Sequence, residues 1–169
     1  MSEGQTLTPK TIGAGRASDF DFLIGRWRVR HRRLRQRLAG CTEWDEFAGR
    51  SELHTLMDGR VNVDDNELEL PGAHYRAVTL RSFEPKTGQW AIWWLDGRQP
   101  HQLDVPMIGG FDGGVGTFYA DDVIAGRAVR VRFLWSDITP TSCRWQQAFS
   151  PNAGKTWEDN WFMDFTRIS

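Results

Sequence analysis

Three polar residues fall on the predicted inner face of strand-like segments, where their side chains could act together on a small molecule. His31 and Arg33 belong to one segment, and Asp159 lies two residues before Trp161 in another. A histidine can shuttle a proton, a carboxylate can orient the histidine, and an arginine can stabilise a developing oxyanion. A buried network in which the three groups satisfy one another is the structural alternative, and the sequence leaves both open.

Aromatic and loop residues extend this candidate ligand-binding site. Nine tryptophans in 169 residues is a large number for rings that need a core or a pocket to fill. We expect Trp94 and Trp161 to line a cavity and Arg98 to contact the ligand. Arg98 and His101 lie in a long loop that could cover the cavity mouth, with mobility supplied by the glycines of residues 108–116. An ordinary surface connection is the alternative.

The segments that must position these residues show a period of two, which is typical of half-buried β-strands. Turn residues such as Asp58-Gly59 and Asp96-Gly97 separate them. A short helical turn over Asp19–Leu23, capped by Ser18, precedes the first strand, and residues 97–115 read as one long irregular loop. The predicted strands are residues 26–33, 43–56, 60–70, 74–83, 90–95, 116–120, 129–135, 142–149 and 157–166.

Such a run of short strands without helical crossovers favours an all-β fold, either a sandwich or a closed antiparallel up-and-down barrel. Closure removes exposed sheet edges, so we predict a barrel of about eight to ten strands. The chain length suits a single domain over residues 19–169. Residues 1–18, rich in Gly, Ser, Thr and Pro, are predicted to be a flexible leader.

The arginine-rich stretch 26–37 raises the question of nucleic-acid binding. Lysine and arginine total 21 against 22 acidic residues, so the domain has no basic excess. The exposed face of this strand also offers no aromatic platforms for base stacking. We therefore expect no nucleic-acid partner, and a solvated or acid-paired outer face that carries Arg26, Arg28, Arg30 and Arg32. Contact with an anionic protein or lipid surface is the lesser alternative.

Several other function classes lack their motifs. The four histidines show no HxH or HExxH spacing, and no GxSxG, Walker loop or strand-linked GxGxxG is present. We therefore expect no metal ion and no cofactor. Cys41 and Cys143 are far apart and are read as reduced thiols. No apolar run reaches the length of a signal peptide or membrane span, so we expect a cytoplasmic protein without a membrane partner.

The residues Gly25 and Trp27, after a short helical turn, resemble the Gly-x-Trp opening of the calycins, or lipocalin-like barrels. That resemblance implies that Arg167, on the last strand, packs over Trp27. Haem-binding calycins carry their histidine ligand late in the chain, where this sequence has none after His101.

The chain also resembles a bacterial family of lipocalin-like domains of unknown function, of the DUF1579 type. The resemblance covers residues 19–167 and implies a fold and a cavity rather than a reaction. The matching runs are residues 62–64, 75–77, 93–96, 131–133, 145–150, 154–158 and 160–161.

Two functional hypotheses follow from a tryptophan-lined barrel. The first is intracellular binding of a small apolar or aromatic molecule, oriented by His31, Arg33 and Asp159. The alternative is a cofactor-independent isomerase, lyase or cyclase that uses the same cavity and the same three residues. An interaction protein with a functional outer arginine face is a third hypothesis. The ligand, the presence of catalysis and the oligomeric state, including a homodimer, stay open.

Overall fold

The computed structural model, which describes residues 15–169, contains ten strands, and in most of them apolar and polar side chains alternate. Most of the predicted leader, residues 1–18, lies outside the described residues. Two short 3-10 helices, η1 (Asp21–Leu23) and η2 (Met57–Gly59), accompany the strands. The strands are β1 (Gly25–Leu34), β2 (Trp44–Leu56), β3 (Val61–Leu68), β4 (Tyr75–Glu84), β5 (Gln89–Asp96), β6 (Met107–Asp112), β7 (Val115–Ile124), β8 (Arg127–Ser136), β9 (Ser142–Ser150) and β10 (Glu158–Arg167).

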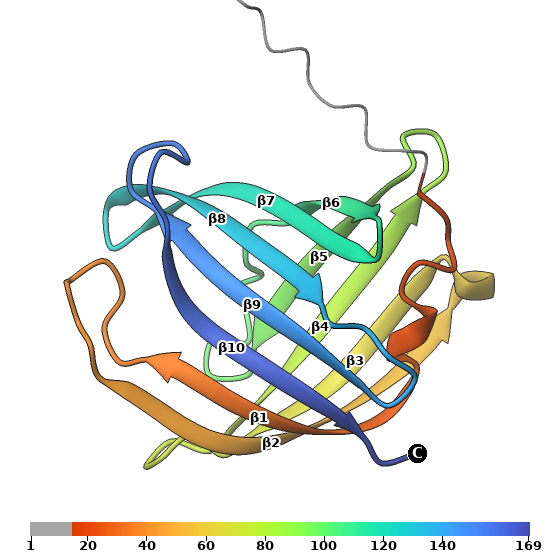
Figure 1. The fold of residues 1–169 in the computed structure, drawn as a ribbon, viewed down its shortest axis with the longest axis horizontal. Coiled ribbons are helices and arrows are strands. Elements are labelled where there is room, and N and C mark those ends of the chain that lie inside the picture. Colours follow the sequence, from red (N-terminus) through yellow and green to blue (C-terminus); the bar gives the residue numbers. More distant parts are fainter. Residues whose placement is uncertain (1–14) are drawn as a thin grey trace, which may run out of the picture.

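The ten strands form one closed antiparallel barrel in which each strand pairs with its neighbours in the chain (Figure 1). Pairing between β1 and β10 completes the ring, with Trp27 opposite Arg167 and Arg33 opposite Trp161. Because the barrel is closed, the sheet has no free edge, which is the physical advantage expected of a barrel over a sandwich. The predicted all-β, up-and-down barrel is therefore confirmed, with ten strands.

Strand β6 lies inside residues 97–115, which the sequence indicated to be one irregular loop. Its two central glycines hide the period-two pattern, because a glycine has no side chain to mark either face. A Cβ on Gly109 would lie only 2.0 Å from the carbonyl oxygen of Thr117 on β7, so the close strand approach requires glycine. Residues 108–116, whose glycines suggested mobility at the cavity mouth, form the β6–β7 hairpin.

The N-terminal helical turn is shorter than predicted. Its N-cap is Phe20, which makes no side-chain capping hydrogen bond, and Ser18 contributes only its backbone carbonyl to Asp21 N–H at 3.0 Å. The turn is held by burial instead, since Phe20 and Leu23 are each only 1% exposed inside one end of the barrel. No helix of residues 15–169 is long and apolar enough to cross a membrane.

Trp27 and Arg167 close the same end of the barrel. The indole N–H of Trp27 donates to the carbonyl of Leu23 at 2.9 Å. The guanidinium of Arg167 lies 4.2 Å from the Trp27 ring and donates to the carbonyls of Ile24 and Phe22 at 2.6 and 2.7 Å. These contacts join the first strand, the last strand and η1, so any cavity must open at the opposite end.

The outer face of β1 carries the arginines whose outward orientation the alternation predicts. Arg26 pairs with Glu52 at 3.1 Å and Arg30 with Glu46 at 3.6 Å on the neighbouring strand β2. Arg32 lies over the ring of Trp44, 4.2 Å from its centroid. Exposed pairs of this kind contribute little stability. The side chains of β1 that can line a cavity are those on its inner face.

Candidate functional site

A cavity of about 380 Å³ occupies the barrel beyond the closed end. Its size falls within the range of about 300–1,000 Å³ that is typical of small-molecule sites. Aromatic side chains from five strands line its wall, and polar side chains lie mainly at its floor and mouth. The aromatic lining residues are Tyr75, Trp94, Trp135, Trp145, Trp161, Phe133, Phe149 and Phe165.

The cavity mouth lies at the end of the barrel where the odd-numbered strands finish and the even-numbered strands begin. The connections of residues 35–43 and 97–106 gather at this end, with the β7–β8 turn and the β9–β10 hairpin (Figure 1). Arg98 and Gln99 are exposed and also line the cavity, which places them at its rim. Because neighbouring strands are antiparallel, every second connection lies at the same end of the barrel, and these loop residues therefore surround one opening.

Four of the residues predicted to contact a ligand do line the cavity together: Arg33, Trp94, Arg98 and Trp161. The guanidinium of Arg33 lies 4.4 Å from the Trp161 ring and donates to the Tyr75 hydroxyl at 3.3 Å. Because Tyr75 belongs to β4, this bond spans the mouth from β1. The guanidinium of Arg98 stacks on the ring of Tyr75, 3.7 Å from the ring centroid.

His31 lies on the inner face of β1 but is packed into the wall rather than exposed to the cavity. Its ring stacks on Phe47 at 4.6 Å, and its Nδ1 accepts a hydrogen bond from Trp161 Nε1 at 3.1 Å. The other edge of the ring faces β2, where a Cβ on Gly49 would lie 2.7 Å from Nε2. Burial and the neighbouring Arg33 lower the pKa of His31 to about 3, so the imidazole is neutral at physiological pH.

Asp159 lies on the outer surface, so the predicted contact with Arg33 or His31 is not made. The register of β10 against β9 shifts between Asp159 and Trp161, which is a β-bulge that places Asn160 and Trp161 inside. Asp159 instead lies 3.5 Å from both Arg132 and Gln146. The prediction of an inward Asp159 was wrong because it assumed strict alternation along β10, without the bulge.

The cavity floor is polar, which the sequence analysis did not anticipate. Asp64 and Arg81 form an ion pair of 2.8 Å, with each side chain 4% exposed. Arg81 also donates to Asn62 at 3.0 Å, while Asp64 accepts from the backbone N–H of Thr79 at 3.1 Å and from Asn66. The signal was available in the alternation of β3, where Asn62, Asp64 and Asn66 share the inner face with Leu68.

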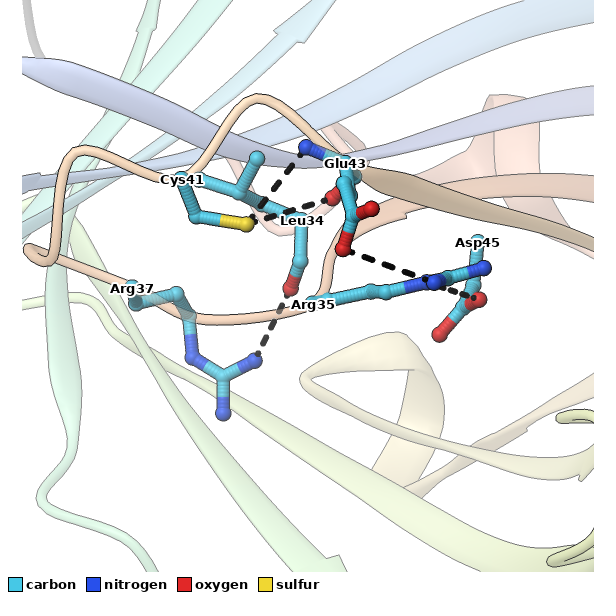
Figure 2. A network of polar contacts seen from close by, with 6 residues as sticks. All are labelled: Leu34, Arg35, Arg37, Cys41, Glu43 and Asp45. Atoms are coloured by element: carbon cyan, nitrogen blue, oxygen red, sulfur yellow. Dashed lines mark hydrogen bonds and ion pairs between the residues drawn. The ribbon is translucent and has the colours of Figure 1, made fainter.

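Arg37 and Asp104 are two mouth residues that the sequence did not indicate. Arg37 belongs to the loop of residues 35–43, where Figure 2 shows it turned away from Arg35 and that residue's carboxylate partners Glu43 and Asp45. Burial and the charge of Arg33 lower the pKa of Arg37. No sequence pattern marks these residues, because only barrel closure brings their loops over the cavity.

The remaining predicted groups lie elsewhere. His101 is exposed and does not line the cavity. Cys41 and Cys143 are free thiols, and burial raises the pKa of Cys143 to about 12. Within residues 15–169, no group of three His, Cys, Asp or Glu side chains is arranged to hold a metal ion.

Comparisons with known proteins support the fold. Among solved structures, the chain is similar to CPES, an S-type phycobiliprotein lyase from Guillardia theta, with a TM-score of 0.57 over 89% of this chain and 90% of that one. The barrel has a calycin-like fold. At 12% identity the likeness shows architecture alone. No protein-family model matches the chain, so the resemblance to the DUF1579-type family stays a prediction. No curated protein matches it either.

Proposed function

We propose that this protein binds a small molecule with an aromatic or apolar body inside the barrel cavity. The observation that carries this proposal is the cavity of about 380 Å³ with its tryptophan-rich wall. Apolar surface transferred from water into such a wall contributes roughly 25 cal/mol per Å². Few polar groups are then needed to orient the ligand, and those present gather at the floor and the mouth.

The ring arrangement of the wall favours an aromatic guest. Trp161 stands edge-on to Trp94 and to Trp145, at interplanar angles of 85° and 88° and centroid distances of 5.9 and 5.4 Å. Rings packed at right angles present both faces and edges, which are the two surfaces that aromatic molecules contact favourably. The stacking of Arg33 on Trp161 holds this central ring in place.

The enzyme alternative built on His31, Arg33 and Asp159 has no geometric support. Asp159 is on the outer surface, and His31 is enclosed by Phe47, Trp161 and the backbone of β2. A neutral imidazole that is buried in the wall cannot deliver a proton to a molecule in the cavity at neutral pH. We therefore propose binding and not acid–base catalysis by these three residues.

The test is a fluorescence titration with N-phenyl-1-naphthylamine, a neutral compound with a naphthyl and a phenyl group that becomes emissive in apolar surroundings. We expect saturable binding with one site per chain. Trp94→Ala should weaken binding about tenfold, which corresponds to about 1.4 kcal/mol of lost contact. The matched control is Trp44→Ala, which removes an indole from the outer face of β2. Absence of saturable binding, or equal weakening by both variants, would refute the proposal.

A further inference from the structure

Two arginines at the cavity mouth lack the carboxylate partner that the other cavity arginines have. Arg81 pairs with Asp64 at 2.8 Å, and Arg98 pairs with Asp96 at 2.7 Å. Arg33 and Arg37 form no ion pair with any carboxylate in the described part of the chain. This difference marks a part of the mouth where two guanidinium groups line the cavity without a carboxylate in direct contact.

The contacts that these two arginines do make leave donors free. Arg33 uses one nitrogen to reach the Tyr75 hydroxyl, at 3.3 Å, and rests its flat face on Trp161. Arg37 donates to the backbone carbonyl of Leu34 at 3.5 Å. A guanidinium carries five N–H donors in a planar fork, so both side chains retain unused donors that can bind an anion.

Arg33 and Arg37 also affect each other. Both side chains line the same cavity. Burial, together with the charge of Arg33, lowers the pKa of Arg37. Two neighbouring cations that are shielded from water repel each other more strongly than they would on an open surface. An anion between them would remove that repulsion and form charge-assisted hydrogen bonds with both forks.

The carboxylates near these two arginines are engaged by other groups. Glu158, whose charge acts on Arg37, accepts hydrogen bonds from the backbone N–H of Leu38 at 2.8 and 3.1 Å. Asp96, at the end of β5, is held by two nitrogens of Arg98. Asp104 lies in the next loop. Burial raises the pKa of Asp104, and the negative charges of Asp122 and Asp96 raise it further. Asp96 and Asp104 thus come from β5 and the loop of residues 97–106, whereas Arg33 and Arg37 come from β1 and the loop after it, although the charge of Arg33 also acts on Asp96.

We propose that Arg33 and Arg37 form an anion-binding subsite, and that the ligand is an organic acid. Its aromatic body lies among the tryptophans, and its carboxylate lies at the mouth between the two guanidinium groups. This inference rests on the proposed binding function and adds the chemical class of the ligand to it. It also assigns Arg37, which no sequence pattern marks, as a residue that determines specificity.

The test compares two competitors of equal shape and different charge. 1-Naphthylacetic acid and 1-naphthylacetamide are each titrated against bound N-phenyl-1-naphthylamine at pH 7.5, where the acid is ionised. We expect the acid to displace the probe at a concentration at least tenfold lower than the amide. Arg37→Gln should reduce this acid-to-amide ratio at least threefold, and Arg33→Gln should reduce it further, because each variant removes one charged fork.

Controls separate this inference from the binding function on which it rests. Arg28→Gln makes the same change of charge on the outer face of β1 and should leave the ratio unchanged. Affinity for the neutral probe reports whether each variant keeps its cavity, and Arg37→Gln leaves the stacking of Arg33 on Trp161 untouched. If the wild-type protein binds the probe but the two competitors displace it equally, the anionic subsite is refuted and binding stands. If the probe itself does not bind, the binding function fails first.

Discussion

The indole N–H of Trp161 donates a hydrogen bond of 3.1 Å to Nδ1 of His31 across the seam between β10 and β1. At neutral pH this bond places the imidazole proton on Nε2, since Nδ1 is the acceptor. The same Trp161 ring supports Arg33 on its face at 4.4 Å. His31 therefore contributes to the site indirectly, by fixing the ring on which the arginine of the mouth rests.

The buried, neutral state of His31 predicts that the fold loses stability in mild acid. The pKa of His31 is about 3 in the folded chain and about 6.5 when the histidine is exposed. Because the unfolded chain binds the proton first, stability is complete above pH 6.5 and falls as the pH drops toward 3. The contribution lost between pH 7 and pH 5 is about 2 kcal/mol.

Urea unfolding at pH 7 and pH 5 measures this loss. His31→Gln should reduce the difference in unfolding free energy between the two pH values by that amount, because glutamine does not titrate. His54→Gln makes the same substitution at an exposed histidine and is the matched control. An unchanged pH dependence in His31→Gln would falsify the assignment of this titration to His31.

Gly49 makes room for the His31 ring, so alanine at this position should destabilise the barrel. A Cβ at position 49 would lie 2.6 Å from the carbonyl oxygen of Glu67 and 2.7 Å from His31 Nε2. Relief of such overlap in a packed barrel costs about 1–3 kcal/mol. Gly110→Ala is the control, because the nearest atom to its Cβ lies at 4.0 Å. Thermal unfolding should show a clear loss for Gly49→Ala and almost none for Gly110→Ala.

The barrel could be predicted because its signal is repeated. Alternation in β1, β4 and β8, with turn residues between strands, indicates antiparallel pairing without knowledge of any single contact. Strand β6 could not be predicted in this way, since its Gly109-Gly110 pair carries no side chains to alternate. A glycine run reads as a loop unless the neighbouring strand that approaches it is known.

The candidate site was predictable in part. Arg33 follows from period two in β1, and Trp161 from the apolar alternation at the end of β10. Asp159 was misplaced by a bulge of one residue, which no local pattern in β10 reveals. Arg37 depends on where a loop crosses the mouth, which is a property of the closed ring and not of the loop sequence.

The ion pair of Asp64 and Arg81 predicts a large effect of a small substitution. Asp64→Asn keeps the shape of the side chain but leaves the Arg81 charge buried without a counter-charge. Removal of one partner from a buried pair costs about 3–5 kcal/mol. Asp65→Asn alters the next residue, which faces solvent and pairs with Arg76, and should cost less than about 1 kcal/mol. Equal effects of the two variants in urea unfolding would contradict burial of the pair.

Arg167 should stabilise the closed end through its hydrogen bonds. It donates to the carbonyls of Ile24, Phe22 and Pro140 at 2.6, 2.7 and 2.8 Å. Arg167→Met keeps an apolar stem over Trp27 but removes these donors, and we expect a loss of about 2–4 kcal/mol in unfolding free energy. Arg26→Met removes only an exposed pair with Glu52 and should cost less than about 1 kcal/mol.

Asp104 should make binding of an acidic ligand depend on pH. Burial, with the neighbouring charges of Asp122 and Asp96, raises the pKa of Asp104, so its carboxylate takes up a proton above the usual range for aspartate. Protonation removes a negative charge from the cavity lining, and affinity for an anion therefore rises as the pH falls through that titration. 8-Anilinonaphthalene-1-sulfonate is the suitable probe, because its sulfonate stays ionised throughout. Asp104→Asn should bind it more tightly at pH 7.5 and show a flatter pH profile, whereas Asp121→Asn, on the outer face of β7, should retain the wild-type profile.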